Sequence, residues 1–172
     1  FGSAEAAFDG FSDDLAGMVG GKAWQELSKM RRMGLDKIAL ALERAGAFAA
    51  VPGDDHFPEI LNGIIDPPDL LFYKGALNRD FGRSIAMVGS RRETRYGQEQ
   101  AYRIARGLAE RGVTVVSGLA RGIDTAAHLG ALEGGGRTAA VLGSGISNVY
   151  PPENKDLADR IAASGGAVIS EF

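Results

Sequence analysis

The second half of the chain alternates short apolar runs with longer stretches of helical periodicity. Residues 85–88, 113–116, 138–142 and 167–169 are apolar runs of strand length, and each ends in small or polar residues. Between them apolar residues recur at intervals of three and four, as at Ala101, Ile104, Ala105 and Leu108. Short buried strands that alternate with amphipathic helices are typical of a parallel sheet. We therefore predict an α/β fold in which helices flank a parallel sheet.

The first 50 residues carry a different pattern. Ala23, Leu27 and Met30 share one helical face, and residues 38–45 repeat that spacing before Gly46. Residues 50–80 are a connector with several Pro and Gly breakers, compatible with a short strand over 70–73 that ends at Gly75. We predict a small, incomplete helical module over 1–50 and a Rossmann-like domain over 51–172, with the chain cut at both ends.

Two loops that follow consecutive strands predict a binding site. In a right-handed βαβ unit both strands point the same way, so residues 89–92 and 117–122 reach the same edge of the sheet, where ligands of such sheets bind. Glycines let the backbone approach a ligand, and each loop leads into a helix N-terminus that favours anions. The candidate phosphate-binding residues are Gly89, Ser90, Arg91, Arg92, Ser117, Gly118, Ala120, Arg121 and Gly122.

Charge supports a localised anion site. The chain has a net charge of −3, but residues 83–121 hold eight arginines and three glutamates, which makes this window +5 and the remainder −8. A basic window in an acidic chain indicates a local polyanion site rather than general adhesion to nucleic acid. The alternative, a solvated helix face, suits Arg103, Arg106 and Arg111 better than the arginines of the Gly-rich loops.

Several kinds of chemistry are disfavoured. The chain has no cysteine and two histidines, so a disulfide framework, a thiolate site or a histidine metal site is not expected. No P-loop motif occurs, and residues 143–145 give only a weak dinucleotide signal. Asp124 and His128 are spaced as a helical pair, although loop support and packing explain them better than catalysis. We expect no catalytic residue, metal or cofactor. No apolar run reaches membrane-spanning length, so a cytoplasmic protein is the default.

Two side chains near the predicted site remain open. Tyr150 is compatible with stacking on a base or with packing beside the adjacent prolines. Glu171 follows the last strand and is compatible with a catalytic role. We prefer a salt bridge that orients Arg91 or Arg121, because no second acid or metal ligand accompanies Glu171 in the sequence.

Taken in order, the motifs of the chain resemble those of the DNA-processing protein A family (DprA, also called Smf), and the match covers nearly the whole sequence. The residues that carry the resemblance are Phe57-Pro58, Leu61, Asp66-Pro67-Pro68, Leu71, Lys74-Gly75, Val88-Gly89-Ser90-Arg91, Ser117-Gly118-Leu119-Ala120-Arg121-Gly122-Ile123-Asp124, His128, Val141-Leu142-Gly143, Tyr150-Pro151, Asn154, Leu157 and Ile169-Ser170-Glu171.

The resemblance implies an extended Rossmann fold that binds single-stranded DNA in a basic pocket without catalysis. It also implies protection of incoming DNA in natural transformation, loading of the RecA recombinase and a homodimer, with no membrane association. Ser90 and Arg91 match the family's phosphate-contacting loop. Its second pocket loop is matched by Ser117, Gly118, Ala120 and Gly122. The helical module resembles the family's sterile-alpha-motif-like domain. We expect the dimer and RecA surfaces to lie beyond Phe172.

Two enzyme classes compete with this interpretation. A nucleotide-monophosphate hydrolase of the lysine-decarboxylase-like group shares a related fold, and residues 134–138 are the closest run to its signature, but no Glu follows at the required spacing. A dinucleotide-dependent oxidoreductase would need an acidic residue for the ribose after residues 143–145, and none stands at that distance.

Overall fold

The computed structural model describes residue 25 and residues 35–172, and the chain divides into two compact units, Phe1–Ala45 and Gly46–Phe172. In the first unit the described element is helix α3, Leu35–Ala45. The helical module predicted over 1–50 therefore lies largely outside the described residues. The second unit begins at Gly46, a few residues before the domain boundary proposed from the sequence.

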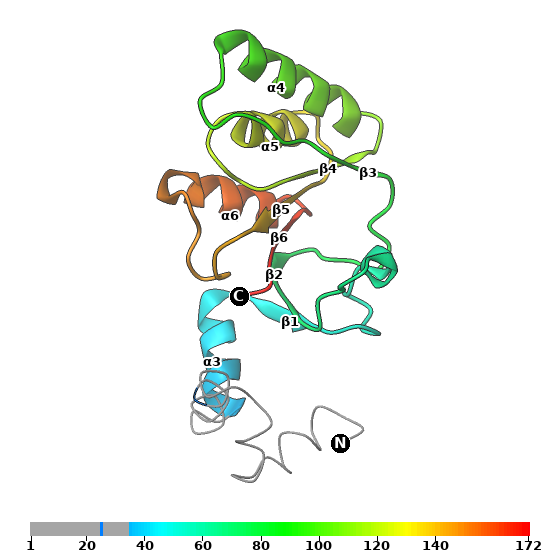
Figure 1. The fold of residues 1–172 in the computed structure, drawn as a ribbon, viewed down its shortest axis with the longest axis vertical. Coiled ribbons are helices and arrows are strands. Elements are labelled where there is room, and N and C mark those ends of the chain that lie inside the picture. Colours follow the sequence, from blue (N-terminus) through cyan, green and yellow to red (C-terminus); the bar gives the residue numbers. More distant parts are fainter. Residues whose placement is uncertain (1–24, 26–34) are drawn as a thin grey trace. The chain divides into compact units, whose positions relative to one another are not determined.

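Within the described residues the second unit is built on one six-stranded sheet with the order β1-β2-β6-β5-β4-β3 (Figure 1). Strands β3 (Ser84–Ala86), β4 (Thr114–Ser117), β5 (Thr138–Leu142) and β6 (Ala167–Ser170) are parallel neighbours. Strands β1 (Phe48–Ala50) and β2 (Leu71–Gly75) extend the sheet beyond β6 in antiparallel orientation. The sheet is thus mostly parallel.

Three helices connect the parallel strands: α4 (Arg95–Ala109), α5 (Ile123–Glu133) and α6 (Lys155–Ala163). Because β3 to β6 are consecutive neighbours and such crossovers are right-handed, the three helices fall on one face of the sheet, as Figure 1 shows. Two short 3₁₀ turns, η2 (Glu59–Gly63) and η3 (Pro152–Asn154), complete the unit. Thr94 caps α4, because its hydroxyl oxygen accepts from the Gly97 amide at 3.1 Å.

Small residues set how closely the helices approach the sheet. Under α4 and α5 the core is Val115 with four buried alanines: Ala105, Ala109, Ala127 and Ala131. Gly130 of α5 lies so close to the Tyr102 backbone of α4 that a Cβ there would collide with it. On the opposite face of the sheet Phe57 and Leu77, from the connector, pack with the strand residues Tyr73 and Ile169. Each face of the sheet therefore has its own core. Because both faces are covered, a binding site is expected at the ends of the strands.

The strands and helices predicted from 85 to 169 are confirmed, although β3 is Ser84–Ala86 rather than the whole apolar run 85–88. Strand β1 was not predicted, since three residues with the exposed Phe48 among them give no readable alternation. The apolar stripe of α4 is also narrower than its sequence suggests: Ala101, Ala105 and Ala109 are buried, whereas Ile104 is 54% exposed.

Candidate functional site

A hollow of about 280 Å³ lies at the carboxyl edge of the parallel sheet. Its lining comes from the loops that follow β3, β4 and β5, and from the segment that leads to η3. We call residues 89–92 the first loop, residues 117–122 the second loop and this cavity the hollow. The lining residues are Arg91, Gly118, Ala120, Arg121, Gly143, Ser144, Tyr150 and Pro151. The two loops predicted from the sequence do meet at this edge, and a third loop, after β5, joins them.

The first and second loops are packed directly against each other. The Ile123 amide donates to the Ser90 carbonyl at 3.2 Å. Gly122 has a φ of +83°, and a Cβ there would collide with the Ser90 carbonyl oxygen. A Cβ on Gly89 would lie 2.7 Å from the Ile123 side chain. Glycine is therefore needed at 89 and 122 for the fit between the loops, so these residues shape the hollow rather than line it.

Asp124 holds the second loop from within. Its carboxylate is nearly buried and accepts from the Gly118 amide at 3.1 Å and from the Ala120 amide at 3.3 Å. The structural interpretation of Asp124 as loop support is thus the one that the geometry favours. The expectation that this loop offers its amides to a phosphate needs correction, because Asp124 already occupies the amides of 118 and 120. Phosphate contact at this edge then depends more heavily on arginine.

Asn154, at the end of η3, clamps the same loop from outside. Its side-chain amide donates to the Leu119 carbonyl at 2.8 Å and to the Thr125 hydroxyl at 2.8 Å. The Thr125 hydroxyl in turn donates to the Ala120 carbonyl at 2.7 Å. Leu119 has a φ of +58°, a conformation that costs a non-glycine residue energy and persists where its surroundings enforce it. The buried Leu119 side chain and the Asn154 clamp together supply that enforcement.

The structure separates the nine predicted site residues into three groups. Four line the hollow: Arg91, Gly118, Ala120 and Arg121. Four shape it from behind: Gly89, Gly122, Ser90, whose hydroxyl accepts from the Arg92 amide at 3.0 Å, and Ser117, whose hydroxyl donates to the Met87 carbonyl at 2.6 Å. The ninth, Arg92, is exposed and is not part of the lining.

The two arginines of the hollow differ in their partners. Arg121 donates from Nε to the Glu153 carboxylate, and its guanidinium carbon lies 5.9 Å from the centre of the Tyr150 ring. The hydrogen bond with Glu153 raises the pKa of Arg121, and the same bond lowers the pKa of Glu153. Among the described residues Arg91 forms no ion pair. The salt bridge expected between Glu171 and Arg121 is replaced by one with Glu153.

The predicted site residues omitted five that belong to the site: Gly143, Ser144, Pro151, Glu153 and Asn154. The first two follow the third apolar run, so the rule that placed the first two loops at the sheet edge would have placed this loop there as well. Asn154 stands among the family motif residues, but its contacts, like those of Glu153, could not be predicted because the partners lie about thirty residues away in the sequence.

His128 is separate from the hollow and is fully buried. The Thr138 hydroxyl uses its proton on the Val115 carbonyl at 2.7 Å, so it must accept from His128 Nδ1, also at 2.7 Å. The ring is then the neutral Nδ1–H tautomer, and its buried Nε2 has no partner among the described residues. Burial lowers the pKa of His128 from 6.5 to about 4. His128 and Asp124 therefore do not form a pair: Asp124 supports the second loop, and His128 is bonded to Thr138 in the core.

The ionisable groups in the lining of the hollow are two arginines and one tyrosine. No group of three or more potential metal ligands occurs among the residues that the structure describes. In the same residues no helix has the length and apolar character needed to cross a membrane.

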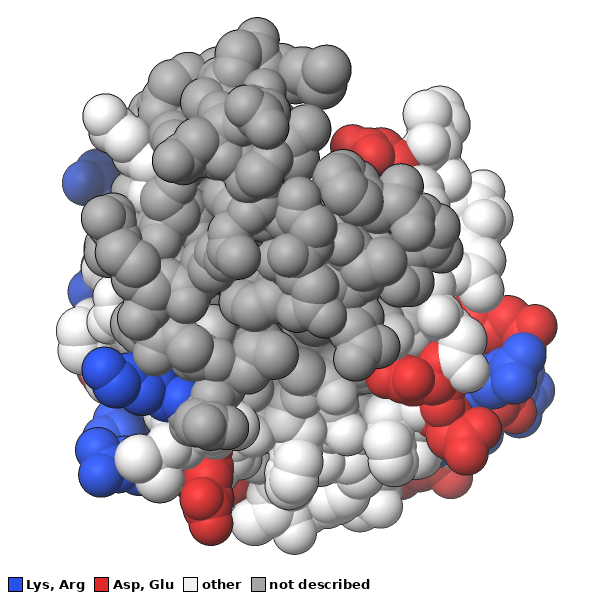
Figure 2. All heavy atoms as spheres, turned by 90° about the horizontal axis from the view of Figure 1, so that it is seen from below, with Lys and Arg blue, Asp and Glu red and all other residues white. Residues whose placement is uncertain are grey.

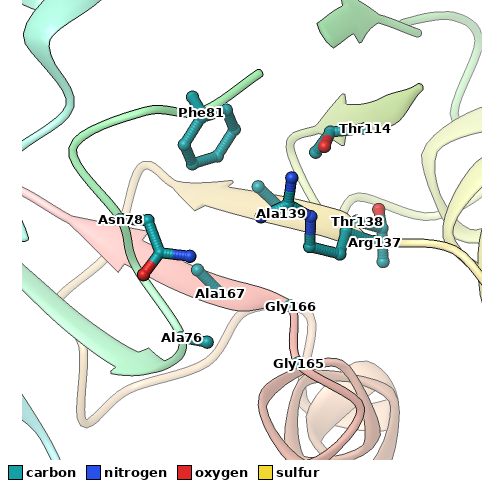
Figure 3. A pocket seen from close by; sticks show the side chains of 10 residues that line it. All are labelled: Ala76, Asn78, Phe81, Thr114, Arg137, Thr138, Ala139, Gly165, Gly166 and Ala167. Atoms are coloured by element: carbon teal, nitrogen blue, oxygen red, sulfur yellow. The ribbon is translucent and has the colours of Figure 1, made fainter. Parts of the chain in front are cut away.

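A second cavity, at the opposite edge of the sheet, is too small for a ligand. Figure 3 shows Asn78 and Phe81 of the connector facing Arg137 and Thr138 at the start of β5. Its volume of about 10 Å³ is enough for a single water molecule. A third depression, between α4 and α5, has a volume of about 360 Å³ and an open surface lined by Gln98, Glu99, Tyr102, Arg103, Ala126 and Leu129.

The charges of the helix surface are partly neutralised within the helix itself. Arg95 pairs with Glu99 and Arg106 with Glu110, each at 3.0 Å. These exposed i,i+4 pairs match the solvated-face interpretation of the helix arginines. In Figure 2 blue side chains lie mainly at the left of the visible face and red ones mainly at the right, and each group includes side chains of the opposite charge. Because Arg95 and Arg106 are paired with glutamates, the positive charge relevant to the site that is unpaired among the described residues is that of the loop residue Arg91.

Comparison with known proteins gives one family. The model of the family described as DNA recombination-mediator protein A matches residues 48–172. DNA processing protein DprA of Streptococcus pneumoniae is 45% identical over 119 residues, which are 69% of this chain and 42% of that protein. Protein Smf of Escherichia coli is 42% identical over 123 residues, 71% of this chain and 33% of that protein. The chain thus spans less than half the length of these curated relatives.

Solved structures give the same result. The X-ray structure of DNA processing protein A from Streptococcus pneumoniae aligns with a TM-score of 0.66 at 40% identity, over 86% of this chain and 51% of that one. DNA processing protein A from Helicobacter pylori, described for its single-stranded DNA binding mode, aligns with a TM-score of 0.60 at 28% identity, over 72% of this chain and 55% of that one. The resemblance seen in the sequence motifs is therefore confirmed, and the chain belongs to the DNA recombination-mediator protein A family.

Proposed function

We propose that this chain binds single-stranded DNA in the hollow at the carboxyl edge of its sheet. The observation that carries the proposal is that Arg91 faces a cavity walled by small residues from three successive loops, with no acidic partner among the described residues. An unneutralised guanidinium in such a cavity is suited to charge-assisted, bidentate contact with a phosphate. The Helicobacter pylori relative, whose structure was described with its single-stranded DNA binding mode, supports the same ligand class.

The size of the hollow favours a single strand over a duplex. At about 280 Å³ it lies near the lower limit of small-ligand pockets, about 300 Å³, and is suited to one nucleotide unit. A duplex reader would instead present a helix or a β-ribbon to a groove about 12 Å wide. The hollow presents arginine among short side chains, and contacts from arginine to phosphate do not read base sequence.

We propose binding without catalysis. General acid–base chemistry needs a group that exchanges a proton near neutral pH, and arginine does not. The lining of the hollow, within the described residues, contains neither a carboxylate nor an imidazole. In the complete protein we propose that this site serves a recombination mediator, which protects incoming DNA during natural transformation and loads RecA as a homodimer. We also propose a chain organised as a helical module over 1–50 and the Rossmann-like domain over 51–172.

The test compares three ligands at matched salt: a single-stranded oligonucleotide, its duplex and a nucleoside monophosphate. We expect the single strand to bind at least tenfold more tightly than the other two, with little dependence on base sequence. Tighter binding to duplex would exclude the proposed site geometry. A preference for the monophosphate, with turnover that disappears in Glu171→Gln, would favour the hydrolase class instead.

A further inference from the structure

We propose that Tyr150 and Arg121 form a stacking site for one nucleobase of single-stranded DNA, beside the phosphate held by Arg91. This inference deepens the proposed function and rests on it. It assigns different tasks to the two arginines of the hollow, which the sequence treats alike. Arg91 contacts the backbone of the strand, and Arg121 contributes to a flat surface for a base.

Arg121 is poorly suited to hold a phosphate because its charge is already matched. Its Nε donates to the Glu153 carboxylate, and both side chains are about half exposed. A phosphate that approached this guanidinium would meet the Glu153 charge as well. The ion pair engages the edge of the guanidinium, which lies over the Tyr150 ring, and a guanidinium plane is a good stacking partner for aromatic rings and bases.

Tyr150 supplies the second half of the surface. It is 58% exposed although it lines the hollow, and the Arg121 guanidinium carbon lies 5.9 Å from its ring centre, within cation–π range. The next residue, Pro151, is buried and anchors the segment. An aromatic ring held by an anchored segment, but left open to solvent, costs little to order when a base covers it.

The rest of the lining of the hollow leaves room for a base. It includes Gly118, Gly143 and Ser144, and a Cβ added to Gly143 would meet no atom within 4 Å. A base against Tyr150 would therefore not be blocked by side chains from the β4 and β5 loops. Every base has a π face, so such a site tolerates any sequence and is compatible with the weak base preference expected of the phosphate contacts.

The experiment measures binding of oligothymidylate and of an abasic oligomer of equal length by fluorescence anisotropy, with thymidine monophosphate as a third ligand. We expect wild type to prefer oligothymidylate over the abasic oligomer. Tyr150→Leu should weaken oligothymidylate binding roughly 5- to 150-fold, the range of base–aromatic stacking on alanine substitution, and leave abasic binding unchanged. Tyr150→Phe, the matched control, should retain most of the affinity.

A companion variant tests the role of Glu153. Glu153→Gln releases the Arg121 charge, so abasic binding should tighten and its log K against log salt slope should steepen by up to about 0.7, one single-strand phosphate. An unchanged slope would show that Glu153 does not shield Arg121 from the strand.

The outcomes separate this inference from the proposed function. If wild type binds oligothymidylate and the abasic oligomer equally well, single-stranded DNA binding stands and the stacking site is wrong. This comparison uses the wild-type protein alone, so misfolding of a variant cannot affect it. Equal losses on both oligomers in Tyr150→Leu would also overturn it. If wild type binds neither oligomer, the proposed function fails. Tight binding of thymidine monophosphate alone would assign the surface to a free nucleotide.

Discussion

At the scale of the residue, Arg91 and Arg92 are neighbours in the sequence with different surroundings. Both are exposed, but Arg91 lines the hollow and Arg92 does not. We expect Arg91→Ala to weaken single-stranded DNA binding and to flatten the log K against log salt slope by about 0.7, because one phosphate contact is lost. Arg92→Ala serves as the matched control and should change both quantities less. Equal effects of the two substitutions on slope and affinity would remove the special role of Arg91.

His128 gives a prediction about stability rather than binding. The pKa of the buried ring is about 4 in the folded chain against an ordinary 6.5, so below pH 6.5 the unfolded chain binds the proton more readily. The free energy of unfolding should therefore fall as the pH drops from about 6.5 to about 4, by up to about 3 kcal/mol from this residue. Chemical denaturation across this range measures the loss.

The comparison variant for His128 is His128→Asn, which keeps a donor for the Thr138 hydroxyl but cannot titrate. Its unfolding free energy at neutral pH should be lower than that of wild type, because the smaller side chain leaves a cavity. Its dependence on pH between 4 and 6.5 should nevertheless be shallower. Parallel curves for the two proteins would show that His128 is not the group responsible.

At the scale of the element, the second loop depends on a clamp from another part of the chain. Asn154→Ala removes donors to the Leu119 carbonyl and the Thr125 hydroxyl and so releases a loop that holds Leu119 at a φ of +58°. We expect single-stranded DNA affinity to fall about fivefold or more, as about 1 kcal/mol of hydrogen bonding is lost. The salt slope should stay near the wild-type value, because no phosphate-binding charge has been removed.

This pattern distinguishes the clamp from a direct contact and from general unfolding. Asn154→Asp is the sharper variant, since a carboxylate cannot donate to the Leu119 carbonyl. Circular dichroism and thermal melting show whether the sheet and helices persist. A flattened slope in the folded Asn154→Ala protein would indicate that Asn154 acts on the DNA charge rather than on the loop, and unchanged affinity would make the clamp irrelevant to binding.

The elements also show how far the sequence could predict the structure. Strands β3 to β6 and helices α4 to α6 were readable because the period of their apolar residues changes at each boundary. Strand β1 was not, since three residues cannot establish a period and its pairing with β2 is tertiary. The loop residues at the site followed from topology alone. The partners Glu153 and Asn154, and the loss of two loop amides to Asp124, depend on side-chain contacts that no local pattern encodes.

At the scale of the whole molecule, the arrangement of the second unit explains why one edge becomes the site. Strands β3 to β6 run in parallel and in chain order, so their following loops gather on one side without any long-range signal. Two further cavities among the described residues lie elsewhere: a water-sized one at the opposite sheet edge and an open depression between α4 and α5. Among the described residues, the hollow brings two arginines together with the loops that follow three successive parallel strands.

The most direct test is to map where single-stranded DNA binds by following backbone amide chemical shifts during titration with oligothymidylate. At 18.0 kDa the chain is accessible to such measurements. The largest changes should fall in residues 89–92, 118–122 and 143–151, with small changes along α4 and at the amino ends of β4 and β5. Changes concentrated on the surface between α4 and α5, with the loops of the hollow unperturbed, would contradict the assignment of the hollow as the single-stranded DNA site.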